Sequence, residues 1–165
     1  MTPELEQKLF KKYPLIFRQK DLPMTQTCMC WGIDCGDGWY NIIDTLCAQI
    51  QHHLNWKNCE GKYEYRRKHE PPPPDAEEGS WVVVPQVEAV QVKEKYGGMR
   101  FYYTGGDDYI QGAVDIAESL SMRTCETCGN PGRQTTSGWI LTLCPAHAAE
   151  KKRELEDDSA DEEEQ

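Results

Sequence analysis

Two pairs of potential metal ligands lie near the C-terminal end of the sequence. Cys125 and Cys128 are separated by two residues, and Cys144 and His147 repeat that spacing after an interval of fifteen residues. Three thiolates and one imidazole complete the tetrahedral shell of zinc, and a two-residue gap lets both ligands of a tight turn reach one ion. Four protein ligands leave no position for water, so we expect one structural zinc ion and no catalytic one.

The residues between and after the ligands predict how the two pairs are brought together. Gly129 follows the second cysteine, where a residue without a Cβ lets the chain turn so that amides approach the sulfurs. The segment QTTSGWILTL, residues 134–143, has alternating apolar residues and a Ser137-Gly138 turn, which predicts a β-hairpin. Cys144 then opens a helix whose dipole favours a bound thiolate. A knuckle, a hairpin and a helix carrying two ligands form a treble-clef-like zinc module.

The other five cysteines do not have the spacing of a zinc knuckle. They are Cys28, Cys30, Cys35, Cys47 and Cys59. Cys47 lies at the edge of an apolar helical stripe, where a thiol packs as a small apolar side chain. We expect core and loop cysteines here; the alternative is a second metal site completed by His52 or His53.

Catalytic groups are present as residue types but not as a motif. A Cys35 nucleophile with His52 or His53 as its base is one arrangement, and an acid–base pair of carboxylates is another. The carboxylates in question are Asp34, Asp37, Asp107 and Asp108. Because these acids stand where helix caps and turns are expected, we interpret the chain as a protein that is not an enzyme.

Basic and aromatic residues that could contact a nucleic acid or a partner occur at two places. They are Tyr63, Tyr65, Arg66, Arg67 and Lys68 in one short segment, and Lys93, Lys95 and Arg100 on a predicted hairpin. Aromatic rings interleaved with cations suit single strands, through stacking and phosphate contact. A solvated loop edge and cross-strand ion pairs are the simpler explanations.

The net charge argues against a broad nucleic-acid-binding surface. The chain of 165 residues carries 18 Lys and Arg against 28 Asp and Glu, a net charge of −10, and residues 151–165 alone contain eight of the acids. An acidic protein attracts a basic partner, such as a protein that handles nucleic acid. The chain shows no apolar stretch long enough for a membrane helix or a signal peptide, so we expect no membrane partner and a cytoplasmic location.

The elements that must position these residues follow from the apolar periodicity. Helices are predicted at 3–13, at 39–54 with Asp37 as N-cap, and from Asp107 or Asp108 to Leu120. Residues 14–36 are predicted to be irregular, and Trp81–Val84 is predicted to be a short strand. Two further strands, at 86–96 and 99–104, are predicted on either side of a Gly97-Gly98 turn. The fold class is therefore α+β, with helices packed on a small antiparallel hairpin sheet.

Three regions of different composition divide the chain. Residues 1–122 form the expected α+β body, within which 57–80 is an exposed proline-rich connection containing PPPP. Residues 123–152 form the zinc-binding module packed on the body. Residues 153–165 are an acidic stretch in which like charges repel, so we expect a flexible tail.

Several of these segments together resemble a known group of small proteins. GDGWYNIIDTLC (36–47), QVKEKYGGMRFYY (91–103), CETCG (125–129) and TLCPAH (142–147) are similar to segments of uncharacterised proteins encoded by bacteriophages and prophages. The resemblance spans roughly residues 13–148 and implies a viral gene context and a zinc site, without any catalytic residue.

The residues and the resemblance together favour a non-enzymatic, phage-encoded, zinc-containing interaction protein. It would bind and modulate a host or phage protein in the cytoplasm of the bacterial host, as host-takeover or anti-defence inhibitors do. A zinc-dependent nucleic-acid-binding protein is the first alternative, and an enzyme of unknown class is the second.

Overall fold

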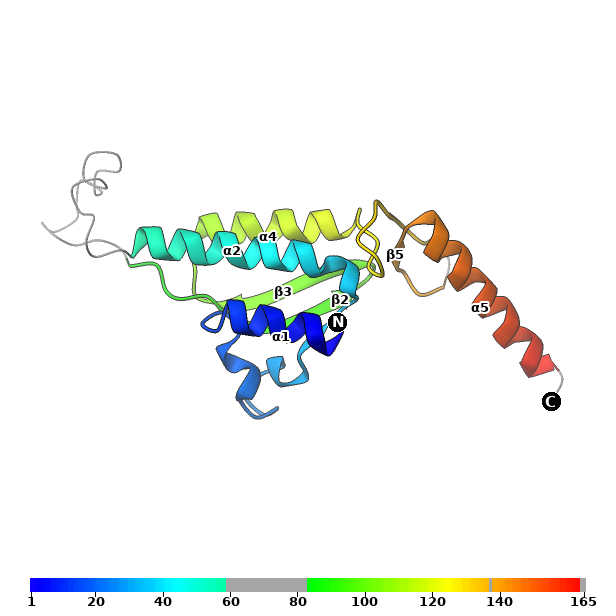
Figure 1. Ribbon diagram of the computed structural model, residues 1–165, viewed down its shortest axis with the longest axis horizontal. Coiled ribbons are helices and arrows are strands. Elements are labelled where there is room, and N and C mark those ends of the chain that lie inside the picture. Colours follow the sequence, from blue (N-terminus) through cyan, green and yellow to red (C-terminus); the bar gives the residue numbers. More distant parts are fainter. Residues whose placement is uncertain (59–82, 137, 164–165) are drawn as a thin grey trace, which may run out of the picture.

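The computed structural model describes residues 1–58, 83–136 and 138–163, with side chains up to Leu155. The elements are helices α1 (Pro3–Lys12), α2 (Tyr40–Lys57), α4 (Asp108–Ser121) and α5 (Pro145–Glu163), 3-10 turns η1 (Arg18–Asp21), η2 (Met29–Trp31) and η3 (Asp37–Trp39), and strands β1 (Ile33–Asp34), β2 (Glu88–Lys95), β3 (Gly98–Thr104), β4 (Arg133–Gln134) and β5 (Thr142–Leu143). The fold is a mixture of helices and two small sheets, as the sequence predicts (Figure 1). The proline-rich connection at 57–80 and the strand start at Trp81 lie, apart from Lys57 and Asn58, outside the described residues.

The predicted hairpin is present, but its turn is one residue earlier than expected. Lys95 pairs with Gly98, so Tyr96 and Gly97 form the turn in place of Gly97-Gly98. Both turn residues have positive φ, 54° and 74°. A two-residue hairpin turn of this kind needs the left-handed conformation twice, and Gly97 supplies its second position. A bulge between Ala89 and Gln91 then breaks the alternation of the strand, so Ala89 and Val92 are the buried residues of β2.

The main sheet is mixed, which corrects the expectation of an antiparallel hairpin alone. β1 pairs with β2 in parallel, with Ile33 opposite Val92, and the strand order is β1-β2-β3. A strand of two residues is too short to show a period of two, so the sequence read 14–36 as irregular chain. Val83 and Val84 do not belong to a strand; instead the side chain of Asn58 bonds both the N–H and the C=O of Val84, at 3.0 and 2.8 Å.

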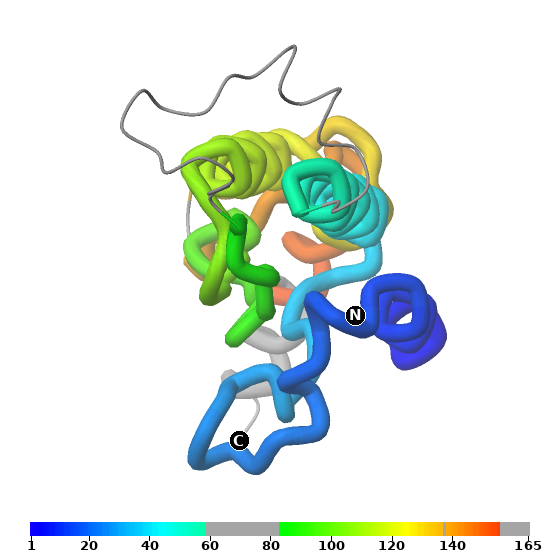
Figure 2. Tube along the Cα trace, turned by 90° about the vertical axis from the view of Figure 1, so that its left-hand side faces the viewer, coloured from blue at the N-terminus to red at the C-terminus, as the bar shows by residue number. Residues whose placement is uncertain are grey.

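Helices α2 and α4 lie side by side and antiparallel over one face of the main sheet (Figures 1 and 2). Their direction follows from contacts at the two ends, where Trp39 Nε1 donates to the carbonyl of Thr124 at 2.8 Å and His53 meets Asp107 at 2.7 Å. Asp107 caps α4, since its carboxylate accepts from the backbone N–H of Ile110. The pairing of α2 with α4 builds the layer that covers the sheet.

Helix α2 begins differently from the prediction. Asp37 does not cap it; η3 comes first, Trp39 is the N-cap, and the Asp37 carboxylate accepts from the backbone N–H of Thr2 at 2.6 Å. That bond ties the start of α1 to the start of α2. The predicted helix start at Pro3 is confirmed, and Thr2 occupies the N-cap position.

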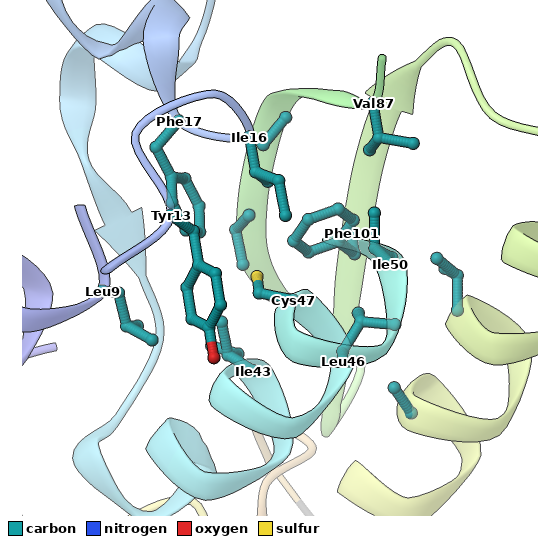
Figure 3. Packing of buried hydrophobic residues seen from close by; sticks show 14 of the residues in the cluster. Leu9, Tyr13, Ile16, Phe17, Ile43, Leu46, Cys47, Ile50, Val87 and Phe101 are labelled. Atoms are coloured by element: carbon teal, nitrogen blue, oxygen red, sulfur yellow. The ribbon is translucent and has the colours of Figure 1, made fainter. Parts of the chain in front are cut away.

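The core lies between these helices, the sheet and the chain that follows α1. The predicted apolar stripe of α2 is buried, with Trp39, Ile43, Leu46, Ile50 and Leu54 each less than 5% exposed. Figure 3 shows Leu9 and Tyr13 on the side of Ile43 of α2, and Ile16 beside Phe101 of β3. One face of the sheet is thus covered by apolar side chains from three helices.

Helix α5 extends away from the rest of the molecule (Figure 1). It runs to Glu163, so residues 153–163, predicted as a flexible tail, are described as part of a helix. Among the described residues, no helix is long and apolar enough to cross a membrane.

Candidate metal centre

Cys125, Cys128, Cys144 and His147 come together at one point, with their ligand atoms within 4.8 Å of one another. The Sγ atoms of Cys128 and Cys144 are 3.8 Å apart, and His147 Nδ1 lies 3.4 Å from Cys125 Sγ and 3.2 Å from Cys144 Sγ. A tetrahedral ion with metal–sulfur bonds of about 2.3 Å and metal–nitrogen bonds of about 2.0 Å separates its ligand atoms by about 3.8 and 3.5 Å. The four side chains therefore have the spacing of a four-coordinate metal site.

Local backbone bonds explain why the first pair of ligands points inward. The N–H of Gly129 donates to the carbonyl of Cys125 at 2.9 Å, and Gly129 has a φ of 78°. The N–H of Cys125 in turn donates to Asn130 at 2.7 Å. This tight turn places both sulfurs on its inner side, as the predicted role of Gly129 requires.

A small hairpin carries the chain from the first pair of ligands to the second. β4 and β5 pair antiparallel, Thr135 bonds Leu141 at 2.8 Å, and the N–H of Glu126 donates to Thr142 at 2.9 Å. Helix α5 then begins at Pro145, so Cys144 and His147 lie at its first turn. The hairpin is shorter than predicted, with two residues in each strand, and the Ser137 position of its turn lies outside the described residues.

Backbone amides favour the ionised form of two of the sulfurs. Burial raises the pKa of Cys125, but hydrogen bonds from the amides of Cys144, Cys128 and Thr127 outweigh it and lower the pKa to about 6. The amide of His147 lowers the pKa of Cys144. Thiolates are the ligand form of cysteine, so the protein prepares these sulfurs for a cation.

The centre is joined to the body by hydrogen bonds from both sides. The amides of Gly36 and Gly38 donate to Glu126, through its carboxylate at 2.9 Å and its carbonyl at 2.7 Å. On the hairpin side, Gln134 donates to the carbonyl of Tyr96 at 2.9 Å, and the Thr142 hydroxyl donates to that of Gly97. A metal bound here would stabilise the junction of η3, the β2–β3 turn and the β4–β5 hairpin.

The remaining cysteines of the described chain stay apart from this centre. Cys28 is exposed, Cys30 is half-buried, and Cys35 and Cys47 are buried. Within the described residues, the Cys125 group is the single cluster of three or more metal-ligating side chains. Cys59 lies outside the described residues. The structure thus supports one metal site and gives Cys47 the core position that the sequence predicts.

The nucleophile–base pair that the sequence left open is not formed. Cys35 lies beside the metal module, whereas His53 lies near the far end of α2, about 20 Å away along a helix that rises about 1.5 Å per residue. Burial raises the pKa of the Cys35 thiol to about 12. His53 instead pairs with Asp107 and stacks on Tyr109, with ring centroids 4.2 Å apart. These contacts fix the start of α4.

The predicted basic residues on the hairpin gather on the sheet but are partly engaged. Lys93 and Arg100 are cross-strand partners, and Lys95 lies two residues from Lys93. Arg100 forms an ion pair with Glu118 at 3.4 Å, and Lys95 Nζ lies 5.6 Å from the centre of the Tyr96 ring. The basic segment Tyr63, Tyr65, Arg66, Arg67 and Lys68 lies outside the described residues.

A hollow beside the metal centre was not predicted from the sequence. It has a volume of about 510 Å³ and is lined by Met1, Asp34, Cys35, Lys93, Glu94, Glu126, Trp139 and Leu141. Trp139 is 76% exposed there, although the sequence placed it on a hairpin strand. The lining comes from five separate parts of the chain, so no local motif could indicate it.

No protein-family model, no curated protein and no solved structure matches the chain. Function must therefore be argued from the site itself.

Proposed function

We propose that the four ligands hold one structural zinc ion in a treble-clef-like module, and that the protein acts by binding another protein. Three thiolates with one imidazole are a common zinc set, and four protein ligands close the shell to substrate. The ion's role is to hold the β4–β5 hairpin and the start of α5 against the body. The role of the hairpin is to present Trp139.

The exposed Trp139 in the acidic hollow is the observation that carries this proposal. Carboxylates of Asp34, Glu94 and Glu126 line the same hollow and outnumber its cationic groups, the Lys93 side chain and the N-terminal amino group of Met1. Burial raises the pKa of Glu126 and the carboxylates of Glu94 and Asp34 add to this, so the pKa stays raised although the Gly36 amide and the N-terminal amino group act to lower it. An incoming cation would relieve this repulsion, so the hollow suits a Lys or Arg side chain.

A tryptophan face next to carboxylates offers a cation two kinds of attraction. The ring attracts a cation through its quadrupole, and the carboxylates attract it by charge. A divalent ion with three thiolates leaves the metal centre with one net negative charge, which adds to the field. Tryptophan is also the residue type most often found at the energetic centre of protein interfaces. The partner is therefore a basic protein. The resemblance to phage-encoded proteins adds that this partner is a host or phage protein and that the chain is a phage-encoded modulator of the host-takeover or anti-defence type.

The nucleic-acid alternative uses Tyr63, Tyr65, Arg66, Arg67 and Lys68, which lie outside the described residues, and within the described chain it rests on Lys93, Lys95 and Arg100. These residues alternate along their strands with buried Val92, Met99 and Phe101, so they lie on the opposite face of the sheet. Because Glu118 already neutralises Arg100, two cations of this face remain for phosphate. Two cations give weak, salt-sensitive binding, which favours the protein-binding proposal.

The test compares two tryptophan variants of the zinc-loaded protein. Trp139→Ala should lose a partner captured from phage-infected bacterial cells, whereas Trp31→Ala, which removes a tryptophan 67% exposed outside the hollow, should retain it. Capture should weaken with salt, since basic and acidic surfaces are screened over about 8 Å at physiological ionic strength. Equal capture by both variants would contradict the role of the hollow.

A direct titration distinguishes the nucleic-acid-binding function from the protein-binding function. Single- and double-stranded DNA and RNA should bind poorly at about 150 mM salt. Submicromolar binding that Lys93→Glu with Lys95→Glu abolishes would favour the nucleic-acid function.

A further inference from the structure

The outward side of α4 presents apolar side chains that the described chain leaves uncovered. A shallow hollow there is lined by Asp115, Ile116, Ser119, Leu120 and Arg123, which we call the α4 face. Ile116 is 64% exposed and Leu120 is 51% exposed. Two large exposed aliphatic side chains on one helix face are typical of an interaction surface.

The α4 face continues into a groove between α2 and α4. The groove has a volume of about 450 Å³, and Ile116 and Leu120 form part of its wall. Its lining residues carry no charge; they are Asn41, Ile42, Thr45, Leu46, Gln49, Tyr109, Ala113, Ile116, Ala117 and Leu120. The chain has a net charge of −10, so two copies of it repel each other electrostatically. This repulsion is weakest where the uncharged residues of the groove face the second copy.

The two charges of the α4 face are placed symmetrically. Asp115 lies on α4 four residues before Ser119, and Arg123, two residues beyond the end of α4, lies four residues after it and lines the same hollow. Arg123 forms no ion pair with a carboxylate in the part of the chain that the structure describes. When two copies of a helix pair antiparallel about Ser119, each Asp115 therefore meets the other copy's Arg123.

We propose that a second copy of this chain docks on the α4 face, with the two α4 helices antiparallel and the two-fold axis at Ser119. A two-fold contact must be self-complementary, because the same patch faces itself. Asp115 and Arg123 satisfy that condition, because each of them faces the residue of opposite charge in the other copy. The small side chain of Ser119 lets the helices approach at the axis.

The apolar residues of the face also satisfy the two-fold condition. Ile116 lies three residues on one side of the axis and Leu120 lies one residue on the other. Along the antiparallel pair, the order is Ile116 of one copy, Leu120 of the second, Leu120 of the first and Ile116 of the second. Neighbouring side chains in this order are two residues, or about 3 Å, apart along the helix. Interdigitation at this spacing gives the packing that helix pairs use.

This contact and the hollow at Trp139 use different parts of the molecule. The hollow is lined from β1, β2 and the β4–β5 hairpin, and no residue of α4 lines it. A dimer through α4 therefore presents two metal modules, each with its own hollow. Two hollows in one particle would strengthen binding to a partner with two sites.

The oligomeric state of the full zinc-loaded chain tests the proposal. Sedimentation equilibrium from micromolar to millimolar concentration should show a reversible dimer. Ile116→Asp should give a monomer whose melting temperature equals that of the wild type at dilutions where the wild type is also monomeric. Leu15→Asp, at an aliphatic residue 50% exposed outside this face, should remain a dimer.

Charge reversal tests the antiparallel geometry itself. Asp115→Arg alone and Arg123→Asp alone should each weaken the dimer by about tenfold or more, because like charges then face each other twice. The double variant restores both pairs with reversed sign, so its dissociation constant should return toward that of the wild type. A monomeric wild type, or a double variant weaker than both single variants, would overturn the proposal.

Discussion

The backbone N–H of Gly38 donates to the carbonyl oxygen of Glu126 at 2.7 Å. This bond joins the turn that precedes the main helix to the residue that follows the first metal ligand. A Cβ at Gly38 would collide with the carbonyl of Cys125 and with the amide of Gly129, both backbone atoms. The approach of the two segments therefore depends on a residue without a side chain.

Gly38→Ala should accordingly separate the metal module from the body and weaken metal binding. Backbone atoms cannot move aside as a flexible side chain can, so we expect a loss of several degrees in melting temperature. Gly112→Ala is the matched control, because a Cβ there meets nothing within 4 Å and α4 gains about 0.5–1 kcal/mol of helix stability. Thermal melts and metal analysis of both variants check this; equal melting temperatures would show that the approach is not tight.

The metal ligands could be predicted from sequence because the information is local. A two-residue gap defines each half-site within four residues, Gly129 follows the first of them, and the structure brings these halves together. The stripe of α2 was predictable for a similar reason, since eighteen helical residues repeat the period several times, and Leu46 is indeed buried.

The features that the sequence did not reveal depend on contacts between distant segments. β1 has two residues and is a strand because Ile33 and Asp34 meet β2, about sixty residues later. The hollow needs β1, β2 and the hairpin at once, so no run of residues indicates it. The hairpin turn lies at Tyr96-Gly97 and not at the predicted Gly97-Gly98, because both pairs suit a two-residue hairpin turn and the sequence does not distinguish them.

Cys128→Ser should abolish binding of one metal ion per chain. Removing one of four ligands opens the shell, and the small C-terminal unit has only a few buried apolar residues to hold it together. Elemental analysis should find about one zinc per wild-type chain and little in the variant, and hydrogen exchange should show opening of residues 123–150. Cys28→Ser, at an exposed cysteine outside the cluster, is the control and should keep its metal.

The buried thiols should be unreactive toward iodoacetamide and should lower stability at alkaline pH. Burial raises the pKa of Cys35 to about 12 and raises that of Cys47 as well. In the unfolded chain these thiols ionise near pH 9.0, so the unfolded state loses protons that the folded state retains, and folding stability falls as pH rises above that value. Each such thiol contributes a slope of about 1.4 kcal/mol per pH unit.

Two measurements check the behaviour of the thiols. Mass spectrometry after alkylation should find Cys28 labelled and Cys35 and Cys47 unlabelled in the folded protein. Urea unfolding at pH 8 and at higher pH should show a smaller loss of stability in the Cys35→Ala, Cys47→Ala variant than in the wild type. An equal loss in both proteins would mean that the thiols do not titrate on unfolding.

Deleting residues 153–165 should leave the melting temperature nearly unchanged. Helix α5 projects away from the body, and Leu155 is 57% exposed. Two bonds near the deletion point lie within the helix, from Lys151 to Glu154 and from Arg153 to Ala149. The deletion removes eight acidic residues, and acids at a helix C-terminus oppose the helix dipole, so this part of α5 contributes little to stability.

The control is a deletion that begins at Pro145 and thereby removes His147. That chain should lose its metal, and its melting temperature should fall well below that of the shorter deletion, because the ligand and the first turn of α5 both go. The 153–165 deletion should retain about one zinc per chain and lose only helical circular dichroism. A drop of many degrees in its melting temperature would mean instead that the acidic end of α5 packs on the body in solution.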